Sequence, residues 1–416
     1  MTNFYVLGAG VVGIATAYAL AQQGFGVSVV DSASGPGEGG ASFGNGAQLS
    51  YSYTDALASP NLVKHLPGLL VGRDPAFRIT PTCSLLFVRW GLELLRNATK
   101  ERFQENTLHI LQLALESRSA MAELRSRHSL SFAFRRSAKM HLYSSEAAFS
   151  KARAAVGLKE KFGVGQEILS PQEAVGREPA LETYAGKLVG AVWSPLDEAG
   201  DCHLFCRELS DVLAAQYGVK FHYGMTVTGL KADNQGLCSI TTSAGEINAR
   251  HAVVALGSAS SGLLQTVGLR VPIWPIQGYS VTLPATKSTP DVSITDTANK
   301  IVFCRLAEKV RIAGLADIGG QKPPFVSKRL QVLLLAAKSA FPRAAEYGAG
   351  PQAWSGLRPM TPSSQPLISA SRIEGLYLNC GHGMLGWTLA AGSAFRLAEI
   401  IRNPTARGHT PHQMRP

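Results

Sequence analysis

The fold is decided by residues 4–31, which read FYVLGAGVVGIATAYALAQQGFGVSVVD. The run 4–7 is short and apolar, as is typical of a strand buried on both faces of a parallel sheet. A Gly-rich turn follows, residues 14–23 are good helix formers, and Gly24 ends the predicted helix. A second apolar strand is expected at 27–30. The stretch therefore predicts a strand–turn–helix–strand unit of a parallel α/β sheet.

The turn within this unit carries glycines in the pattern Gly-x-Gly-x-x-Gly. Gly8 permits a tight turn, Gly10 lets the backbone approach a pyrophosphate, and Gly13 lets helix and strand pack closely. The helix N-terminus stabilises the phosphate charge, and Asp31 ends the second strand, where a carboxylate can accept a hydrogen bond from a ribose hydroxyl. The pattern predicts a dinucleotide site formed by Gly8, Gly10, Val11, Val12, Gly13 and Asp31.

Two further Gly-rich segments favour FAD over NAD as the dinucleotide. The loop at 39–48 supplies backbone donors for the middle of an extended cofactor. The turn at 381–386 begins a helix near the end of the chain, and a helix start can stabilise negative charge on the N1/O2 edge of a reduced flavin. Two sites at opposite ends of the chain fit one long cofactor. The residues predicted to bind it here are Ser42, Asn45, Gly46, Gln48, Gly257, Gly383, Met384, Leu385 and Gly386.

The other periodic segments are interleaved along the chain. A long amphipathic helix is expected over about 101–127, and a second helix begins after Asp201 and ends at Gly218. Further strands are predicted at 219–223, 225–230, 237–242, 245–248, 252–256, 276–283, 301–305, 310–315 and 376–379, with a final helix to about 401. We therefore predict an α/β fold in which a Rossmann-type FAD-binding domain is assembled from discontinuous segments and joined to an α+β substrate domain with an antiparallel sheet. The boundaries are 1–80, 195–270 and 350–416 for the first domain, and 81–194 and 271–349 for the second.

Composition narrows the class of protein. The chain has 416 residues, of which 45% are hydrophobic and 17% charged, and these values exclude a disordered polyelectrolyte. The formal net charge is +11, but the basic residues are dispersed and form no recognised nucleic-acid module. We therefore expect no nucleic-acid partner. Six scattered cysteines are expected to be reduced thiols of a cytosolic protein, and no metal site is predicted.

No segment has the pattern of a signal peptide or of a membrane-spanning helix. The sequence thus favours a cytoplasmic protein. The positive charge, including the basic tail at 402–416, which we expect to be loosely ordered, leaves open a peripheral contact with an acidic membrane surface.

At this point the motifs carry a family resemblance. The chain resembles the FAD-dependent D-amino acid dehydrogenases, within the larger group that includes D-amino acid oxidase and glycine oxidase. The resemblance covers essentially the whole chain in order. It rests on VLGAGVVG (6–13), ASFGNGAQ (41–48), DEAGDCHLF (197–205), PIQGYS (275–280), WSGLRPMTP (354–362) and NCGHGMLGWT (379–388).

The resemblance implies that a D-amino acid is oxidised by hydride transfer from its α-carbon to flavin N5, and that the imino acid then hydrolyses. It implies that Arg358 clamps the substrate carboxylate, the alternative being a structural ion pair. Tyr279 is expected to line the substrate face of the flavin, although an ordinary strand aromatic would look the same. Tyr53, just past the flavin loop, is a similar candidate. His382 is expected near the pyrimidine end of the flavin, or it merely fills the turn.

The sequence departs from the family pattern at three places. YTDALASPN at 53–61 stands where the dehydrogenases read YAAPWAAPG, Met384 replaces the usual Thr, and Gln277 replaces the usual Lys. The first departure alters the predicted substrate entrance, and a narrower substrate such as D-proline or a hydroxylated D-proline is our hypothesis.

Three alternatives stay open for the electron acceptor and for the role of the chain in a larger complex. The acceptor is expected to be a quinone or a redox partner subunit. The first rival is an oxidase of the glycine, sarcosine or D-amino acid type that uses O2. The second is a non-catalytic FAD-binding subunit of a larger complex.

Overall fold

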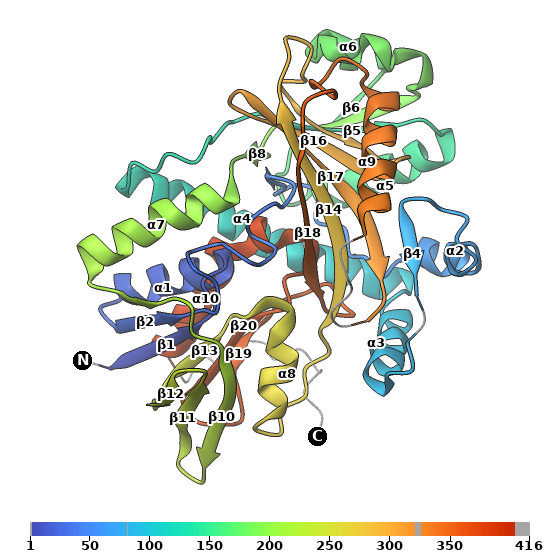
Figure 1. Cartoon of the computed structure of the whole chain (residues 1–416). Helices are drawn as coiled ribbons and strands as arrows, with labels where there is room; N and C mark the ends of the chain where they lie inside the picture. Colours follow the sequence, from blue (N-terminus) through green and yellow to red (C-terminus); the bar gives the residue numbers. More distant parts are fainter. Residues whose placement is uncertain (1, 81, 321–325, 404–416) are drawn as a thin grey trace.

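The computed structural model describes residues 2–80, 82–320 and 326–403. Two sheets dominate it: a six-stranded sheet at the lower left of Figure 1 and a larger sheet that rises to the upper right. The tail at 404–416, which contains most of the segment expected to be loosely ordered, lies outside the described residues.

The six-stranded sheet is assembled from segments far apart in the sequence. Its order is β19-β20-β13-β1-β2-β9, and every neighbouring pair is parallel except β19 with β20. Such discontinuous assembly of a parallel sheet confirms the predicted fold class. The strands are β1 (Asn3–Leu7), β2 (Gly26–Val30), β9 (Lys220–His222), β13 (Ala252–Val254), β19 (Leu367–Ala370) and β20 (Leu376–Cys380).

Each face of this sheet is covered by a different layer. Successive side chains of a strand point to opposite faces, so Val6 of β1 packs among the helices while Leu7 packs on the other side. The helical layer consists of α1 (Val11–Gln22), α4 (Lys100–Arg127), α7 (Cys202–Tyr217) and α10 (Gly386–Arg402). The opposite layer consists of α8 (Ser260–Gln265) and a three-stranded antiparallel sheet of β10 (Val227–Asp233), β11 (Gly236–Thr242) and β12 (Gly245–Asn248).

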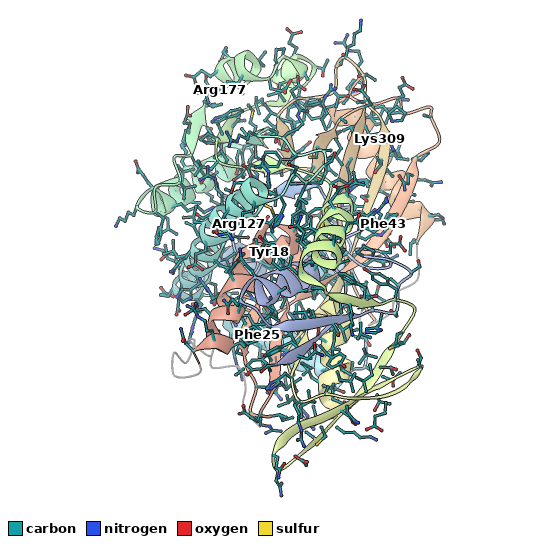
Figure 2. All side chains as sticks on the ribbon, turned by 90° about the vertical axis from the view of Figure 1, so that its left-hand side faces the viewer. Tyr18, Phe25, Phe43, Arg127, Arg177 and Lys309 are labelled. Carbon is teal, nitrogen blue, oxygen red and sulfur yellow. The ribbon has the colours of Figure 1, made fainter. Side chains whose placement is uncertain are left out.

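Several contacts fix the helical layer. Helices α4 and α10 cross closely at Gly392, because a Cβ there would lie 2.8 Å from the carbonyl oxygen of Leu113. Asp201 caps α7 by accepting hydrogen bonds from the backbone N–H of His203 and Leu204, as predicted. Figure 2 shows Tyr18 of α1 in the interior of this layer, close to the C-terminal end of α4 at Arg127.

The large sheet has nine strands and is mostly antiparallel. Its order is β18-β14-β17-β16-β15-β5-β7-β6, and β4 pairs with β17. Helix α9 (Ser327–Ala340) packs on one face together with α6 (Pro171–Arg177), and we call this the helix face. The strands are β4 (Phe77–Ile79), β5 (Lys139–Tyr143), β6 (Glu167–Leu169), β7 (Gly190–Ser194), β14 (Trp274–Pro284), β15 (Ser293–Asp296), β16 (Ile301–Leu306), β17 (Lys309–Ile318) and β18 (Gln352–Met360).

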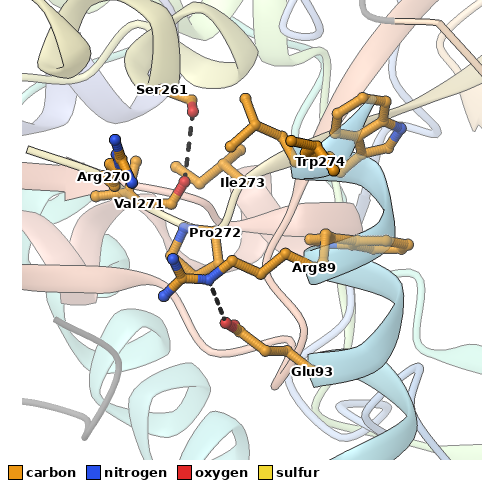
Figure 3. Close-up of a pocket in the computed structure, with 11 residues that line it drawn as sticks. Arg89, Glu93, Ser261, Arg270, Val271, Pro272, Ile273 and Trp274 are labelled. Carbon is orange, nitrogen blue, oxygen red and sulfur yellow. Dashed lines mark hydrogen bonds and ion pairs between the residues drawn. The ribbon is translucent and has the colours of Figure 1, made fainter. Parts of the chain in front are cut away.

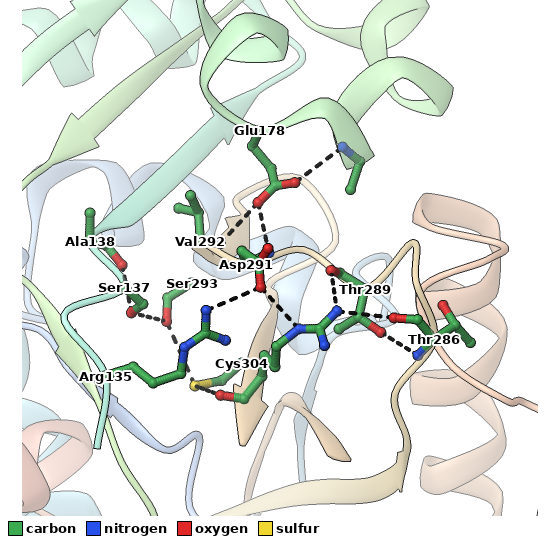
Figure 4. A network of polar contacts seen from close by, with 12 residues as sticks. Arg135, Ser137, Ala138, Glu178, Thr286, Thr289, Asp291, Val292, Ser293 and Cys304 are labelled. Carbon is green, nitrogen blue, oxygen red and sulfur yellow. Dashed lines mark hydrogen bonds and ion pairs between the residues drawn. The ribbon is translucent and has the colours of Figure 1, made fainter. Parts of the chain in front are cut away.

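A polar network holds the segment before β15 to residues that precede β5 and follow α6 (Figure 4). Glu178 accepts hydrogen bonds from the backbone N–H of Asp291 and Val292. The Asp291 carboxylate in turn pairs with Arg135 and Arg305, at 3.1 and 3.2 Å. Residues from four separate parts of the chain thus converge at the N-terminal end of β15.

The sheets assign three segments differently from the predicted domain division. β4 lies within 1–80 and β18 within 350–416, yet both strands belong to the large sheet. Helix α4 lies within 81–194, yet it packs on the six-stranded sheet with α1 and α10. The physical reason is pairing: β18 continues the large sheet by lying antiparallel along the whole of β14.

Candidate active site

The turn between β1 and α1 requires glycine for steric reasons. Gly8 has φ +114°, and a Cβ on it would lie 2.5 Å from the carbonyl oxygen of Ala255. A Cβ on Gly13 would lie 1.8 Å from the carbonyl oxygen of Gly8. Both contacts involve backbone atoms that cannot move aside, so this turn tolerates no side chain at either position.

The start of α1 presents backbone donors to the loop that follows β2. The N-cap residue of α1 is Gly10, which has no side chain to cap the helix, and the first turn contains no acidic residue. The N–H of Val11 donates to Ser42 Oγ at 2.9 Å, and a Cβ on Gly10 would lie 3.3 Å from the same oxygen. Val12 and Gly13 complete the first turn. An uncapped helix start beside glycine is a ready site for a phosphate anion.

Asp31 lies at the end of β2, beside a pocket. Its carboxylate accepts hydrogen bonds from the N–H of Ala9 at 2.6 Å and of Ala33 at 2.8 Å, which fixes its orientation. Each carboxylate oxygen retains a lone pair for a ribose hydroxyl. Gly257, with φ +57°, lies in the sequence between Leu256 and Ala259, which both line the pocket. The pocket measures about 160 Å³ and is lined by Asp31, Ser32, Thr226, Val227, Thr228, Leu256, Ala259, Gly262 and Leu263.

The loop at 39–48 lies against the large sheet, on the face opposite α9. The carbonyl oxygen of Gly44 accepts a hydrogen bond from Ser280 Oγ at 2.6 Å, and a Cβ on Gly46 would lie 3.2 Å from Val302. Asn45 Oδ1 accepts the N–H of Ala47 within the loop. We call this surface of the sheet the loop face.

Neighbouring contacts hold the same loop at both of its ends. Gln48 begins the short strand β3 (Gln48–Leu49), which pairs with β8 (Glu198–Ala199). Its Nε2 lies 3.5 Å from the carbonyl oxygen of Ile294. At the other end, Phe43 packs on the ring of His203 of α7, and Figure 2 shows it beside that helix. The loop therefore bridges the two sheets.

The turn at 381–386 provides a second uncapped helix start. Gly383 has φ +56°, and a Cβ there would lie 2.6 Å from Met360 Sδ. Met384 is 54% exposed, while Leu385 and Gly386 are half-buried. Within the described chain, α10 begins at Gly386 with no side-chain cap and no acidic residue in its first turn. Its backbone donors can therefore meet a negative charge.

Arg358 of β18 is a half-buried cation on the loop face. Its guanidinium lies over Gly278, where a Cβ would be 2.3 Å from Nη2, and Gly278 shares its face of β14 with Ser280. Nη1 donates to the carbonyl oxygen of Leu315 at 2.9 Å. Burial lowers the pKa of Arg358 to about 10. No carboxylate of the described residues forms an ion pair with it, so the structural ion pair considered above is not formed.

Tyr279 points to the opposite face of β14. Its hydroxyl donates to Asp317 at 3.0 Å, and Arg329 of α9 pairs with the same carboxylate at 2.8 Å. The ring packs in the cluster that contains α9, and burial together with Asp317 raises the pKa of Tyr279. The structure therefore does not bring Tyr279 to the loop face beside Arg358.

Tyr53 lies on the loop face, within a buried polar cluster that the sequence analysis missed. Its ring stacks on His141 of β5 with 3.9 Å between ring centroids. Lys139 Nζ lies 5.1 Å and Lys159 Nζ 5.5 Å from the Tyr53 centroid. Lys159 pairs with Asp55 at 2.8 Å. Alternation of polar and apolar residues in β5, KMHLY, is the one signal that could have revealed Lys139 and His141.

Burial shifts the proton equilibria in this cluster, which we call the Tyr53 cluster. The pKa of Lys139 falls to about 8, and that of His141 falls well below its usual range. The pKa of Asp197 rises to about 6, since burial outweighs the nearby Lys139 charge. Neither ring nitrogen of His141 has a hydrogen-bond partner in the described chain. The ring nitrogens of His141 can therefore form hydrogen bonds with a bound ligand.

His382 is packed into the turn. Its Nε2 lies 2.9 Å from Ser393 Oγ of α10, and burial lowers its pKa to about 3. The imidazole is therefore neutral at physiological pH, and it holds the 381–386 turn on α10.

The chain is similar along nearly its whole length to known flavoenzymes. The model of the DAO family, described as FAD dependent oxidoreductase, matches residues 4–400. The chain belongs to this family of flavoenzymes. A Ralstonia nicotianae protein named D-amino acid dehydrogenase 2 is 40% identical over 95% of both chains. A Paramagnetospirillum magneticum protein named D-amino acid dehydrogenase is 38% identical over 95% of this chain and 94% of its own. The resemblance predicted from the motifs is thereby confirmed.

Solved structures support the fold. Glycine oxidase from Geobacillus kaustophilus superimposes with a TM-score of 0.77 over 100% of this chain and 99% of its own, at 21% identity. L-proline dehydrogenase from P. horikoshii gives 0.75 over 99% and 95%, at 18% identity. The cofactor of this family of flavoenzymes is FAD. The start of α1 fits the pyrophosphate of this cofactor, the pocket beside Asp31 fits its adenosine end, and the start of α10 fits its flavin ring.

Proposed function

We propose that this FAD dependent oxidoreductase oxidises a D-amino acid and passes the electrons to an acceptor other than O2. The relatives named D-amino acid dehydrogenase, 33–40% identical over nearly the full length, support the substrate class. FAD supplies the hydride acceptor, and the protein contributes binding, orientation and exclusion of water. The cofactor is held by backbone donors of the Gly8–Gly13 turn, by Asp31 at the ribose, by the 39–48 loop and by the start of α10.

The observation that carries the proposal is that Arg358 forms no ion pair with a carboxylate of the described residues. A half-buried guanidinium without a carboxylate partner can bind an anion, and its planar fork matches an amino-acid carboxylate in two hydrogen bonds. Its position above Gly278 on the loop face puts that anion beside the loop that we assign to FAD. Arg358 thus fixes the α-carbon in one orientation toward the cofactor, which is the main requirement of hydride transfer.

The remaining site residues divide into two roles. Tyr53 and the neutral His141 line the polar end of the site, where an imidazole nitrogen can accept a hydrogen bond from a donor group of the substrate. Tyr279 and His382 act as positioning residues: Tyr279 anchors β14 through Asp317, and His382 anchors the 381–386 turn through Ser393.

We further propose a quinone as the acceptor, in a cytoplasmic protein that contacts the membrane peripherally. The segment 53–61 departs from the YAAPWAAPG pattern, and its Asp55 pairs with Lys159 inside the Tyr53 cluster. This departure changes the lining of the proposed substrate entrance and supports a narrower substrate, D-proline or a hydroxylated D-proline.

A panel of D- and L-amino acids tests the proposal, with an artificial dye acceptor and a parallel peroxide assay on the purified holoenzyme. We expect dye reduction with D-amino acids alone, fastest with cyclic ones, and no peroxide. Peroxide formed in proportion to turnover would favour an oxidase. If no substrate bleaches the flavin band of the isolated protein, a non-catalytic FAD-binding subunit becomes the better description. Faster turnover of D-alanine than of any cyclic substrate would refute the proline preference.

A further inference from the structure

Helices α2 (Pro60–Leu70) and α3 (Leu85–Arg96) expose several large apolar side chains, although surface helices normally turn polar residues outward. Eleven large hydrophobic side chains are exposed in the described chain, and seven of them lie on this surface. The four on α3 recur at intervals of three and four residues, so they form one stripe. We call these seven residues the α2–α3 face: Val63, Leu70, Val71, Leu85, Val88, Leu92 and Leu95.

The exposed apolar side chains of α3 lie on the side of the helix opposite to the one that packs on the rest of the protein. Trp90 and Leu94 on the other side of α3 are buried against Trp274 and Met360, and the indole N–H of Trp90 donates to the carbonyl oxygen of Met360 at 2.9 Å. Leu62 of α2 packs in the same cluster. Both helices are therefore anchored from within, at the right-hand side of Figure 1, and leave a second apolar side outward.

The polar residues around the face are mainly basic. Residues 59–100 contain six Lys or Arg and two Asp or Glu, and both acidic residues are already paired, Asp74 with Lys300 and Glu93 with Arg89. Within the described residues no ion pair involves the four exposed cations Lys64, Arg73, Arg96 and Lys100. An apolar stripe bordered by free cations complements a surface that is apolar inside and anionic outside.

A pocket adjoins the stripe. It measures about 330 Å³ and lies between α3 and the segment 270–274 (Figure 3). Leu85, which is 86% exposed, belongs to both the pocket and the stripe. Ile273 in the pocket wall lies against Gly381, where a Cβ would be 3.5 Å from its Cδ1. The pocket wall therefore touches the turn assigned to the flavin.

We propose that the α2–α3 face docks this enzyme on a lipid bilayer with anionic headgroups. The inference rests on the proposed function in one respect, since a membrane quinone is the acceptor. The apolar side chains enter the acyl boundary, the four free cations bind headgroups, and an acyl or prenyl chain fits the adjoining pocket. A chain bound in that pocket would then be separated from Gly381 of the 381–386 turn by the Ile273 side chain.

Other occupants fit less well. Protein interfaces are enriched in aromatic residues, and none of the seven exposed side chains is aromatic. A two-fold contact with a second copy would bring two surfaces of the same positive charge together, which is repulsive.

Vesicle flotation of the holoenzyme tests the docking. We expect binding to vesicles of phosphatidylcholine with phosphatidylglycerol and at least tenfold weaker binding to phosphatidylcholine alone. Val88→Glu with Leu92→Glu should weaken binding at least tenfold, and should leave FAD content, thermal midpoint and dye reduction in solution unchanged. Leu335→Glu is the matched control, because Leu335 is 70% exposed on α9, outside the face.

Three results would overturn the docking: equal binding by the double variant and wild type, equal binding to neutral vesicles, or a concentration-dependent dimer that the double variant abolishes, which would assign the face to a second copy. Dye reduction in solution needs no membrane. An inactive but vesicle-bound enzyme would therefore contradict the proposed function and leave the docking intact.

Discussion

The Gly8–Gly13 turn and the loop face of the large sheet are specified in different ways. In the turn, a Cβ on Gly13 would collide with the carbonyl oxygen of Gly8 in the same turn, so glycine is the only residue that fits there. On the loop face, side chains from distant strands meet: Arg358 donates to Leu315 of another strand, 43 residues away. Cofactor binding is thus encoded locally in the backbone, whereas substrate binding is encoded by side chains that only the completed sheet brings together.

The largest effect is expected in the turn. Gly13→Ala places a Cβ 1.8 Å from the carbonyl oxygen of Gly8, so helix α1 must shift from β1. We expect a loss of more than about 4 kcal/mol of unfolding free energy and loss of FAD, within the range of exceptional single substitutions. The absorbance ratio of flavin to protein and a urea titration measure both.

Gly157→Ala is the control for that prediction. Gly157 lies in α5 (Glu146–Glu160), and a Cβ there meets nothing within 4 Å. The change should stabilise the helix by up to about 1 kcal/mol. Retention of FAD by Gly13→Ala would show that the turn is less constrained than its geometry indicates.

On the loop face, the largest effect is expected at Arg358. Arg358→Lys keeps a charge but loses the planar fork, and Arg358→Met loses both. We expect kcat/KM for the D-amino acid to fall about 10-fold for Lys and more than about 100-fold for Met, the cost of one or two charge-assisted hydrogen bonds. Steady-state dye reduction measures this, and FAD content should not change. An unaltered KM and kcat in Arg358→Met would remove the carboxylate clamp from the site.

The Tyr53 cluster makes stability depend on pH. The pKa of Asp197 is raised from 3.8 to about 6 in the folded protein, so the native state binds a proton that the unfolded chain releases. Unfolding free energy should therefore fall as pH rises from about 4 to 6, by on the order of 2 kcal/mol. Asp197→Asn should remove this fall while keeping the oxygen that accepts the Ser52 N–H. Urea titrations at pH 4 and 7 give the difference, and an equal fall in both proteins would assign the effect to other groups.

The contrast between the two regions also explains what the sequence could predict. β1, α1, β2, the Asp201 cap and the final helix follow from local periodicity and capping, and the structure confirms them. The direction of Tyr279 could not be predicted, since most of β14 is buried on both faces and its sequence has no alternation to mark the loop face. The Tyr53 cluster was missed because its members come from separate segments: Tyr53 and Asp55 follow the flavin loop, whereas His141 lies in β5 and Lys159 in α5.

The smallest effect is expected at Met384, in the turn that begins α10. Met384 is 54% exposed, so Met384→Thr, which restores the residue usual in the family, should change unfolding free energy by less than about 0.5 kcal/mol. A hydroxyl donor at the start of α10 would stabilise the reduced flavin by about 0.5–1 kcal/mol and raise its two-electron midpoint potential by roughly 10–20 mV. Potentiometric titration of both holoenzymes measures the shift, with Leu335→Thr as a control on a distant exposed position. A potential that stays constant would mean that the 381–386 turn does not face the N1/O2 edge, and the assignment of this turn to the flavin ring would then have to move to the 39–48 loop.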